Sequence, residues 1–145
     1  MSVPDAVLAE IVAAIPGGVL APTDTDQQFT AGQIPVFDGI IPKTPPDRYV
    51  IVYIDNGTRH ALAACGQSDS AYVRWQTTAV APDGGQVRWL GDKVLGSVDV
   101  TPTATGWVCG QIQHVYGQRP QRDETVAERP VVYLIDQFEV LATRA

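Results

Sequence analysis

The stretch of this chain that most constrains its fold is an apolar run at residues 49–54, with the sequence YVIVYI. The run is rich in β-branched and aromatic residues, two prolines precede it and Asn56-Gly57 follows it, so a strand is favoured over a short helix. A strand with one wet face would alternate apolar and polar side chains, which this run does not do. We therefore expect a strand that is covered on both faces, lies centrally in a sheet and ends in a tight turn at Asn56-Gly57.

Two helices are expected, one before and one after this strand. Ser2 can cap the first helix, Pro4 stands in its first turn, where a missing N–H costs nothing, and Pro16 ends it. Its apolar residues recur at helical spacing at Val7, Leu8, Ile11, Val12 and Ile15. The second helix has an apolar face formed by Val87, Leu90, Val94 and Val98. Its glycines, Gly91 and Gly96, weaken it by about 1 kcal/mol each, so packing on the sheet has to hold it in place.

The remaining segments with a clear pattern have strand character. Residues 71–80 alternate, with Val73 and Trp75 among the less polar positions on one side and polar residues on the other. Further strands are expected at residues 34–37, 58–64, 107–115 and 131–141. The first of these should lie at a sheet edge, because Pro35 lacks the N–H that an interior strand donates.

These elements predict an α+β fold in a single domain spanning residues 1–145. We expect a mostly antiparallel or mixed sheet of about four to five strands, with two helices packed on one face. Residues 20–47 carry five prolines and are expected to form a connector, and residues 116–129 a polar loop with charges of both signs. That loop is either a solvated connection or a docking loop, because Arg is enriched at protein interfaces.

Composition limits the classes of function. A length of 145 residues fits one domain. The net charge of −6 argues against a nucleic-acid grip, which rests on clustered Lys and Arg. No apolar run approaches the roughly 20 residues of a membrane span, and no signal peptide is evident, so we expect a soluble protein made in a cytoplasm. Cys65 and Cys109 lack the paired spacing of a zinc site and are expected to be unpaired thiols.

No motif in the sequence points to catalysis. The chain has no Gly-x-Ser-x-Gly elbow, no glycine-rich phosphate loop with Lys and no His-Glu-x-x-His. Cys65 could in principle form a thiolate pair in space with His60 or His114, but neither histidine stands near a nucleophile signature. We predict no catalytic, cofactor-binding or metal-binding residue, and we expect no cofactor. This pattern favours a binding or assembly protein over an enzyme.

Several segments carry a resemblance to a known family. They are residues 36–42 (VFDGIIP), 46–53 (PDRYVIVY), 73–80 (VRWQTTAV), 107–110 (WVCG) and 132–140 (VYLIDQFEV). Together with the order of the expected elements, they resemble the tail terminator, or tail-to-head joining, proteins of long-tailed bacteriophages, in the versions found in phages of actinobacteria. The likeness covers most of the chain from Val36 to Leu141, and its motifs are structural. Residues 21–34 and the long loop at 118–128 depart from the usual pattern.

The resemblance implies a structural virion protein located at the neck, between tail and head, and assembled in the cytoplasm of the host. Such a protein forms a hexameric ring with copies of itself, caps the tail tube protein, stops tail polymerisation and offers a surface to the head connector or stopper protein. DNA passes through the ring without sequence-specific binding, and an acidic chain suits that passage. The alternatives are another neck protein, either a head-closure protein or a connector adaptor, and a small-molecule-binding or hydrolytic domain with a pocket near Cys65 or His114.

A ring subunit needs two different patches, because a head-to-tail contact joins unlike surfaces. We predict that the polar loop supplies one patch, in which Arg119, Arg122 and Arg129 pair with acidic groups such as Asp24 and Asp26 of a neighbouring subunit, or with the tail tube.

Overall fold

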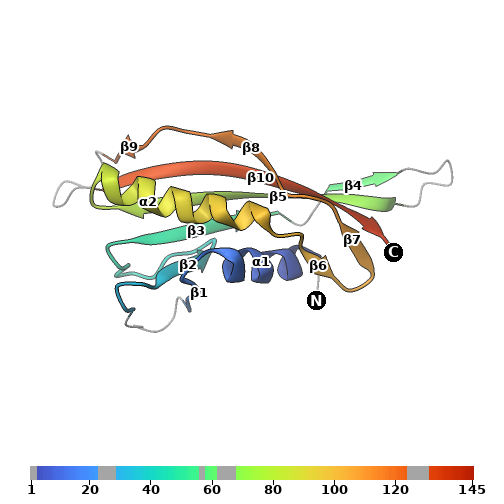
Figure 1. Cartoon of the computed structure of the whole chain (residues 1–145), viewed down its shortest axis with the longest axis horizontal. Coiled ribbons are helices and arrows are strands. Elements are labelled where there is room, and N and C mark those ends of the chain that lie inside the picture. Colours follow the sequence, from blue (N-terminus) through green and yellow to red (C-terminus); the bar gives the residue numbers. More distant parts are fainter. Residues whose placement is uncertain (1–2, 23–28, 56–57, 62–67, 124–130) are drawn as a thin grey trace.

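The computed structural model describes residues 3–22, 29–55, 58–61, 68–123 and 131–145. Within these residues it contains two α-helices, a short 3-10 helix and ten strands (Figure 1). In chain order they are α1 (Val3–Ala14), β1 (Gly18–Leu20), β2 (Ile34–Asp38), β3 (Tyr49–Ile54), β4 (Thr58–Ala61), β5 (Ser68–Ala81), α2 (Gly84–Leu95), η1 (Gly96–Asp99), β6 (Thr103–Ala104), β7 (Trp107–Cys109), β8 (Gln113–Gly117), β9 (Gln121–Arg122) and β10 (Val132–Arg144).

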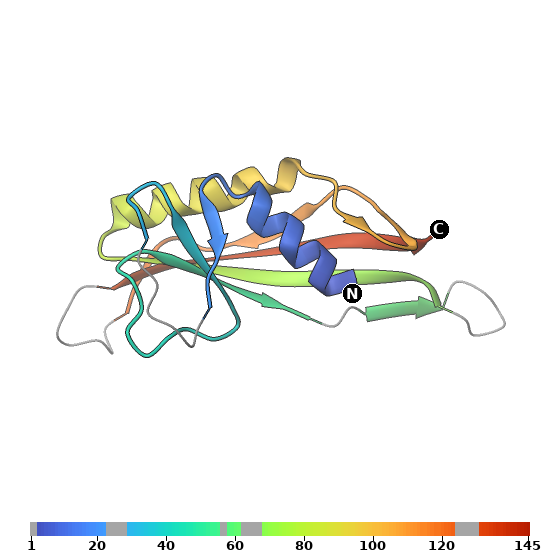
Figure 2. The same cartoon turned by 90° about the horizontal axis from the view of Figure 1, so that it is seen from below.

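All ten strands belong to one mixed sheet, with the order β1-β2-β3-β5-β10-β7-β6 and with β4, β8 and β9 attached beside that path. The two pairs β1–β2 and β2–β3 are parallel, and the others are antiparallel. The longest pairing joins β5 to β10, from Val132 opposite Ala81 to Thr143 opposite Ser70, and these two strands run along the length of the molecule (Figure 2). The α+β class is confirmed, and four to five strands was an undercount.

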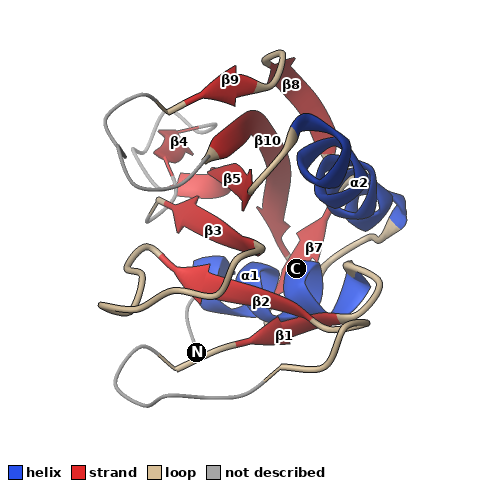
Figure 3. Ribbon diagram, turned by 90° about the vertical axis from the view of Figure 1, so that its left-hand side faces the viewer, coloured by secondary structure: helices blue, strands red, loops and turns tan. Residues whose placement is uncertain are grey.

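The sheet curls around both helices (Figure 3). Helix α2 packs on β5 and β10, and α1 packs on β1, β6 and η1. The apolar stripes of the two helices share one large core with the inward-facing residues of the strands. Trp75 of β5 and Leu90 of α2 both lie in this core, with 3% and 0% of their surface exposed, as the sequence pattern predicts.

Helix α2 begins at a well-formed cap. The Asp83 carboxylate accepts hydrogen bonds from the Gln86 backbone N–H at 2.8 Å and from the Gln86 side-chain amide at 2.9 Å. These bonds hold the pKa of the Asp83 carboxyl below its ordinary value. A capped start and a buried face allow this glycine-containing helix to persist despite its weak propensity.

The edge prediction for residues 34–37 is wrong, because β2 lies between β1 and β3. Pro35 is tolerated there because of the register. The β2–β3 pairing begins at Val36, opposite Val50, so the Pro35 nitrogen lies before the first paired residue. On the other side, Ile34 donates to Gly17 and Val36 accepts from Ala21, so the β1 contacts need no N–H from Pro35.

The prediction of one strand at 107–115 followed by a polar loop is also corrected. Residues 107–123 follow a single edge of β10, as β7, β8 and β9 in turn, each antiparallel to it. Hydrogen bonds from Gln118 to Ile135 and from Asp123 to Val131 continue the pairing between the strands. The predicted loop therefore follows β10 up to residue 123, with strands at its start and at Gln121–Arg122. Its remainder, the turn predicted at residues 56–57 and the hairpin residues 62–64 lie outside the described residues.

The central strand, β3, was expected to be covered on both faces, but one of its faces is covered only at one end. A second, smaller core covers one end of the face that points away from the helices, formed by Ala21, Phe37, Tyr49, Ile51 and Val80 with Phe29, Val131 and Tyr133 packed against them. Tyr53, on the same face as Tyr49 and Ile51, lies beyond this cover and is 46% exposed. The expectation of full burial is therefore wrong at Tyr53, because the residues of the second core cover β3 at Tyr49 and Ile51 but do not extend over Tyr53.

Candidate functional site: the helix-free face of the sheet

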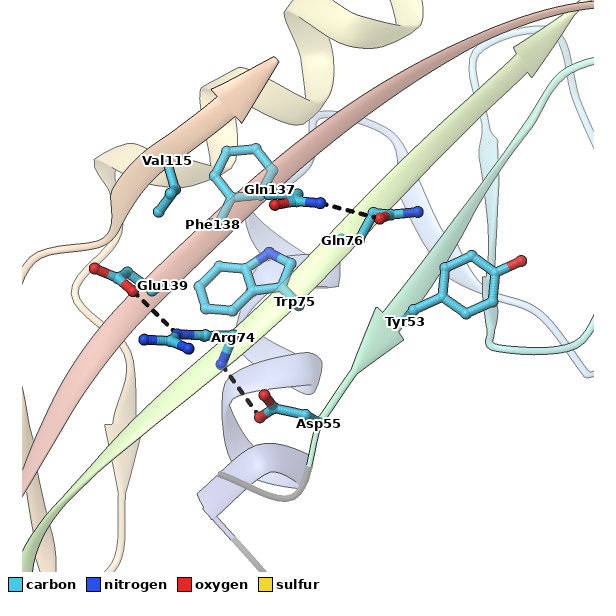
Figure 4. A pocket seen from close by; sticks show the side chains of 9 residues that line it. All are labelled: Tyr53, Asp55, Arg74, Trp75, Gln76, Val115, Gln137, Phe138 and Glu139. Atoms are coloured by element: carbon cyan, nitrogen blue, oxygen red, sulfur yellow. Dashed lines mark hydrogen bonds and ion pairs between the residues drawn. The ribbon is translucent and has the colours of Figure 1, made fainter. Parts of the chain in front are cut away.

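The uncovered part of the outer face forms a shallow concave surface on three neighbouring strands and β8. Since side chains alternate along a strand, the residues between the buried ones on β5 and β10 point away from the helices. Together with the buried residues Trp75 and Phe138, they line a hollow of about 380 Å³. Its lining consists of Tyr53, Asp55, Arg74, Trp75, Gln76, Val115, Gln137, Phe138 and Glu139 (Figure 4). We call this surface the outer hollow.

Cross-strand pairs organise the outer hollow. Arg74 lies opposite Glu139 in the β5–β10 register, and its Nε is 3.2 Å from a Glu139 carboxylate oxygen. Gln76 lies opposite Gln137, whose amide nitrogen donates to the Gln76 side-chain oxygen at 3.3 Å. Asp55 accepts from the Arg74 backbone N–H at 3.3 Å. The Arg74 side chain is 59% exposed, so this ion pair contributes about 1 kcal/mol at most.

The outer hollow offers groups that can bind a partner. They include two amides, one ion pair, the Asp55 carboxylate and the exposed ring of Tyr53, which together offer hydrogen bonds and an apolar surface. It is open and shallow, and Tyr53, Arg74 and Val115 are all reachable by a large partner. These are features of a protein contact surface.

Strand β8 adds an exposed sheet edge to this surface. All five of its residues are exposed, including Val115 at 56% and Tyr116 at 48%. One edge of β8 pairs with β10, and among the described residues no strand occupies its other edge. Natural edge strands discourage pairing with another chain through Lys, Pro or a β-bulge, among other devices. Residues 113–117 contain neither Lys nor Pro, although their register on β10 shifts at one point, and Arg119, Pro120 and Arg122 follow in and beside β9.

A buried carboxylate fixes β8 to β10. His114 Nε2 lies 2.8 Å from Asp136 Oδ1, and the imidazole packs on Phe138 with ring centroids 5.1 Å apart. Asp136 is 5% exposed. Burial raises the pKa of its carboxyl above the ordinary value, while the hydrogen bond and charge of His114 act in the opposite direction. A side chain at Gly117 would bring Cβ within 2.8 Å of Asp136 Oδ1, so the close approach of the strands here requires glycine.

The structure places two of the five predicted interface residues. Arg119 and Arg122 are exposed. Arg122 lies in β9, opposite Val132 of β10, so both arginines follow the same edge of β10 as β8 does. Arg129, Asp24 and Asp26 lie outside the described residues. The structure thus locates these two arginines beside the β8 edge, and the patch stays a prediction.

The structure describes only some of the residues of the alternative site, the pocket near Cys65 or His114. Cys109 is a free, buried cysteine, and burial together with the charge of Glu10 raises the pKa of its thiol. His114 pairs with Asp136. Cys65 lies outside the described residues, and the side chain of His60 is not described.

Sequence reasoning missed the outer hollow, although one of its signals was visible. The alternation in residues 71–80 put Arg74 and Gln76 together on a wetter face. The sequence does not show the pairing register of β5 and β10, which places Glu139 opposite Arg74 and Gln137 opposite Gln76.

The described residues contain no group of three His, Cys, Asp or Glu side chains arranged to hold a metal ion. Neither helix in the same residues has the length and apolarity that crossing a membrane requires. A comparison with models of known protein families gave no match, and neither did a comparison with curated protein sequences.

Proposed function

We propose that this protein is a non-enzymatic assembly subunit that joins copies of itself and partner proteins through the β8 edge and the adjoining outer hollow. The observation that carries the proposal is β8, an exposed sheet edge without Lys or Pro. Its free N–H and C=O groups fit another strand, and Val115 and Tyr116 supply apolar contact. Arg119 and Arg122, which follow β8, add the charged rim that protein interfaces usually have.

The resemblance described above gives this assembly role a specific form. The protein would cap the phage tail tube as a hexameric ring, stop tail growth and present a joining surface to the head connector, with DNA passing through the opening. Its place would be the neck of the virion. The support for this form is the α+β class, the two helices in one core and an exposed sheet edge suited to joining subunits.

The test places a charge on the β8 edge. Val115→Lys should leave the monomer folded, because changes at exposed positions usually alter stability by about 0.5 kcal/mol or less. It should prevent ring formation in the presence of tail tube protein, measured as particle mass by analytical ultracentrifugation and as tail length by electron microscopy. Arg119→Glu combined with Arg122→Glu should have the same effect.

The chain offers a matched control in Val108, which is 61% exposed in β7. Strand β7 follows the same edge of β10, but β6 already occupies its outer side. Val108→Lys should therefore assemble normally. If Val115→Lys and the double Arg variant still form rings and still end tails at normal length, the β8 edge is not the interface. Wild-type protein that caps DNA-filled heads instead of tubes would identify a head-closure protein or connector adaptor, and a monomer that caps neither would exclude both.

A further inference from the structure

A separate exposed feature lies on α2, outside its buried face. Trp89 is 36% exposed, whereas Val87, Leu90 and Val94 of the same helix are buried in the core. The exposed part of this large aromatic ring can offer apolar contact to a partner. Trp is also among the residue types that contribute most at protein interfaces.

Two cations flank the Trp89 ring. The Arg48 guanidinium carbon lies 4.9 Å from the ring centroid, and the Lys93 ammonium lies 5.5 Å from it. Lys93 is one turn further along α2, and Arg48 immediately precedes β3. Arg48 also donates to the Ala31 carbonyl at 2.8 Å, which fixes the direction of its guanidinium. The three side chains therefore form a small basic cluster held by the fold.

The cations of this cluster lack an anionic partner within the described chain. Neither Arg48 nor Lys93 forms an ion pair with a carboxylate of the residues that the structure describes. A guanidinium has five N–H donors, and the Ala31 carbonyl and the indole face leave some of them available.

We propose that Trp89, Arg48 and Lys93 form a docking site for an acidic segment of a partner protein, in which carboxylates lie near an apolar side chain. The carboxylates would meet the two cations, and the apolar side chain would cover the indole. Hydrogen bonds between Arg and a carboxylate are charge-assisted and stronger than neutral ones. The proposal stands apart from the assembly role, since the cluster is on α2 and not on the β8 edge.

A nucleic acid is the poorer occupant on physical grounds. Nucleic-acid binding rests on many cations that neutralise successive phosphates, and this cluster has two. A short acidic segment with an apolar residue needs only the contacts that the cluster provides.

The three tryptophans allow a direct test by NMR, because each indole N–H gives its own signal. The probe is a capped synthetic peptide in which leucines alternate with glutamates. It should shift the Trp89 signal in a saturable way, while the signals of the core residue Trp75 and of Trp107 stay in place. The comparison probes are the same peptide with lysine in place of glutamate, and a short DNA duplex.

Variants then assign the binding to the cations. Arg48→Gln and Lys93→Gln should each weaken binding of the acidic peptide by about two- to fivefold, as expected for an exposed ion pair. Arg144→Gln is the matched control, because Arg144 lies 5.3 Å from the Trp107 ring in a similar contact elsewhere. It should leave the affinity unchanged.

Four results would overturn the proposal: a Trp89 signal that does not respond to the acidic peptide, an equal response to the lysine peptide, tighter binding of the DNA duplex, or an equal loss of affinity in Arg144→Gln.

Discussion

Gly91 of α2 lies so close to Leu134 of β10 that a Cβ added to the glycine would be 2.5 Å from Leu134 Cδ2. The helix backbone thus rests directly on a side chain of the sheet. Gly91 is buried, and Leu134 packs against the main core. The glycine that weakens α2 as an isolated helix is what allows it to lie on the sheet at this distance.

Gly91→Ala should therefore destabilise the protein, although alanine favours a helix by about 1 kcal/mol over glycine. Overpacking a core costs about 1 to 3 kcal/mol, so a net loss is expected in the free energy of unfolding measured by urea denaturation. Gly96→Ala is the control, because its added Cβ would make only an ordinary contact, 3.8 Å from Pro16. In a Leu134→Ala background, Gly91→Ala should no longer destabilise. A loss of the same size in both backgrounds would contradict the contact.

Leu90→Ala should lower the free energy of unfolding by about 2 to 5 kcal/mol, because it removes a fully buried side chain. Leu95, at the end of the same helix, is 36% exposed, and Leu95→Ala should cost clearly less. Both variants are compared by urea denaturation. Equal losses would mean that α2 does not present Leu90 to the core.

The buried carboxylate predicts a particular dependence of stability on pH. Burial raises the pKa of Asp136 in the folded protein, so the folded state keeps its proton when the unfolded state has lost it. Stability contributed by this group is therefore present at low pH and is lost as pH rises from about 4 through the folded pKa. The free energy of unfolding of wild type minus that of Asp136→Asn should fall over this range.

That difference is measured by urea denaturation at a series of pH values, so that contributions from groups that do not interact with Asp136 cancel. Asp83→Asn supplies the opposite case, because hydrogen bonds from Gln86 lower the pKa of Asp83. Its wild-type minus variant difference should grow as pH rises, since stability from a lowered pKa is lost on acidification. A difference for Asp136 that rises with pH would show that the His114 contact outweighs burial.

Cys109 should react slowly with thiol reagents while the protein is folded. Its side chain is buried, and burial and Glu10 raise the pKa of the thiol, so little of the reactive thiolate is present at neutral pH. In a Cys65→Ser variant, alkylation followed by mass spectrometry should be much faster in urea than in buffer. Equal rates would indicate that Cys109 is exposed in solution.

Patterns of local origin predicted much of this fold. Val73 and Trp75 stand in an alternating pattern, and Leu90 stands in a helical one. Each pattern arises because a single element faces one core, so the sequence alone is sufficient to predict the strand and the helix. Residues 107–122 were harder, because their register on β10 changes between β7, β8 and β9, at points set by the partner strand. Strand β1 has three residues, too few for a pattern.

The outer hollow could not be predicted from local sequence patterns. The polar side of β5 was visible in the sequence, but Arg74 meets Glu139 only because β10 pairs at one register among several that its residues permit. Tyr53 looked buried because its run is apolar throughout, and it is exposed because the cover over Tyr49 stops short of it. How far a covering segment reaches is a tertiary property.

The pairing pattern around β10 also determines the order in which this protein can be completed as it leaves the ribosome. Strands β7, β8 and β9 precede β10 in the chain, and each pairs with it. Strand β5 gains its longest partner in the same step. Each of these segments has to remain without this partner in the growing chain until β10 has been made. The four pairings of β10 therefore form late, and the longest of them joins β5 to a strand far along the chain, a topology that slows folding and prolongs the exposure of unpaired strands.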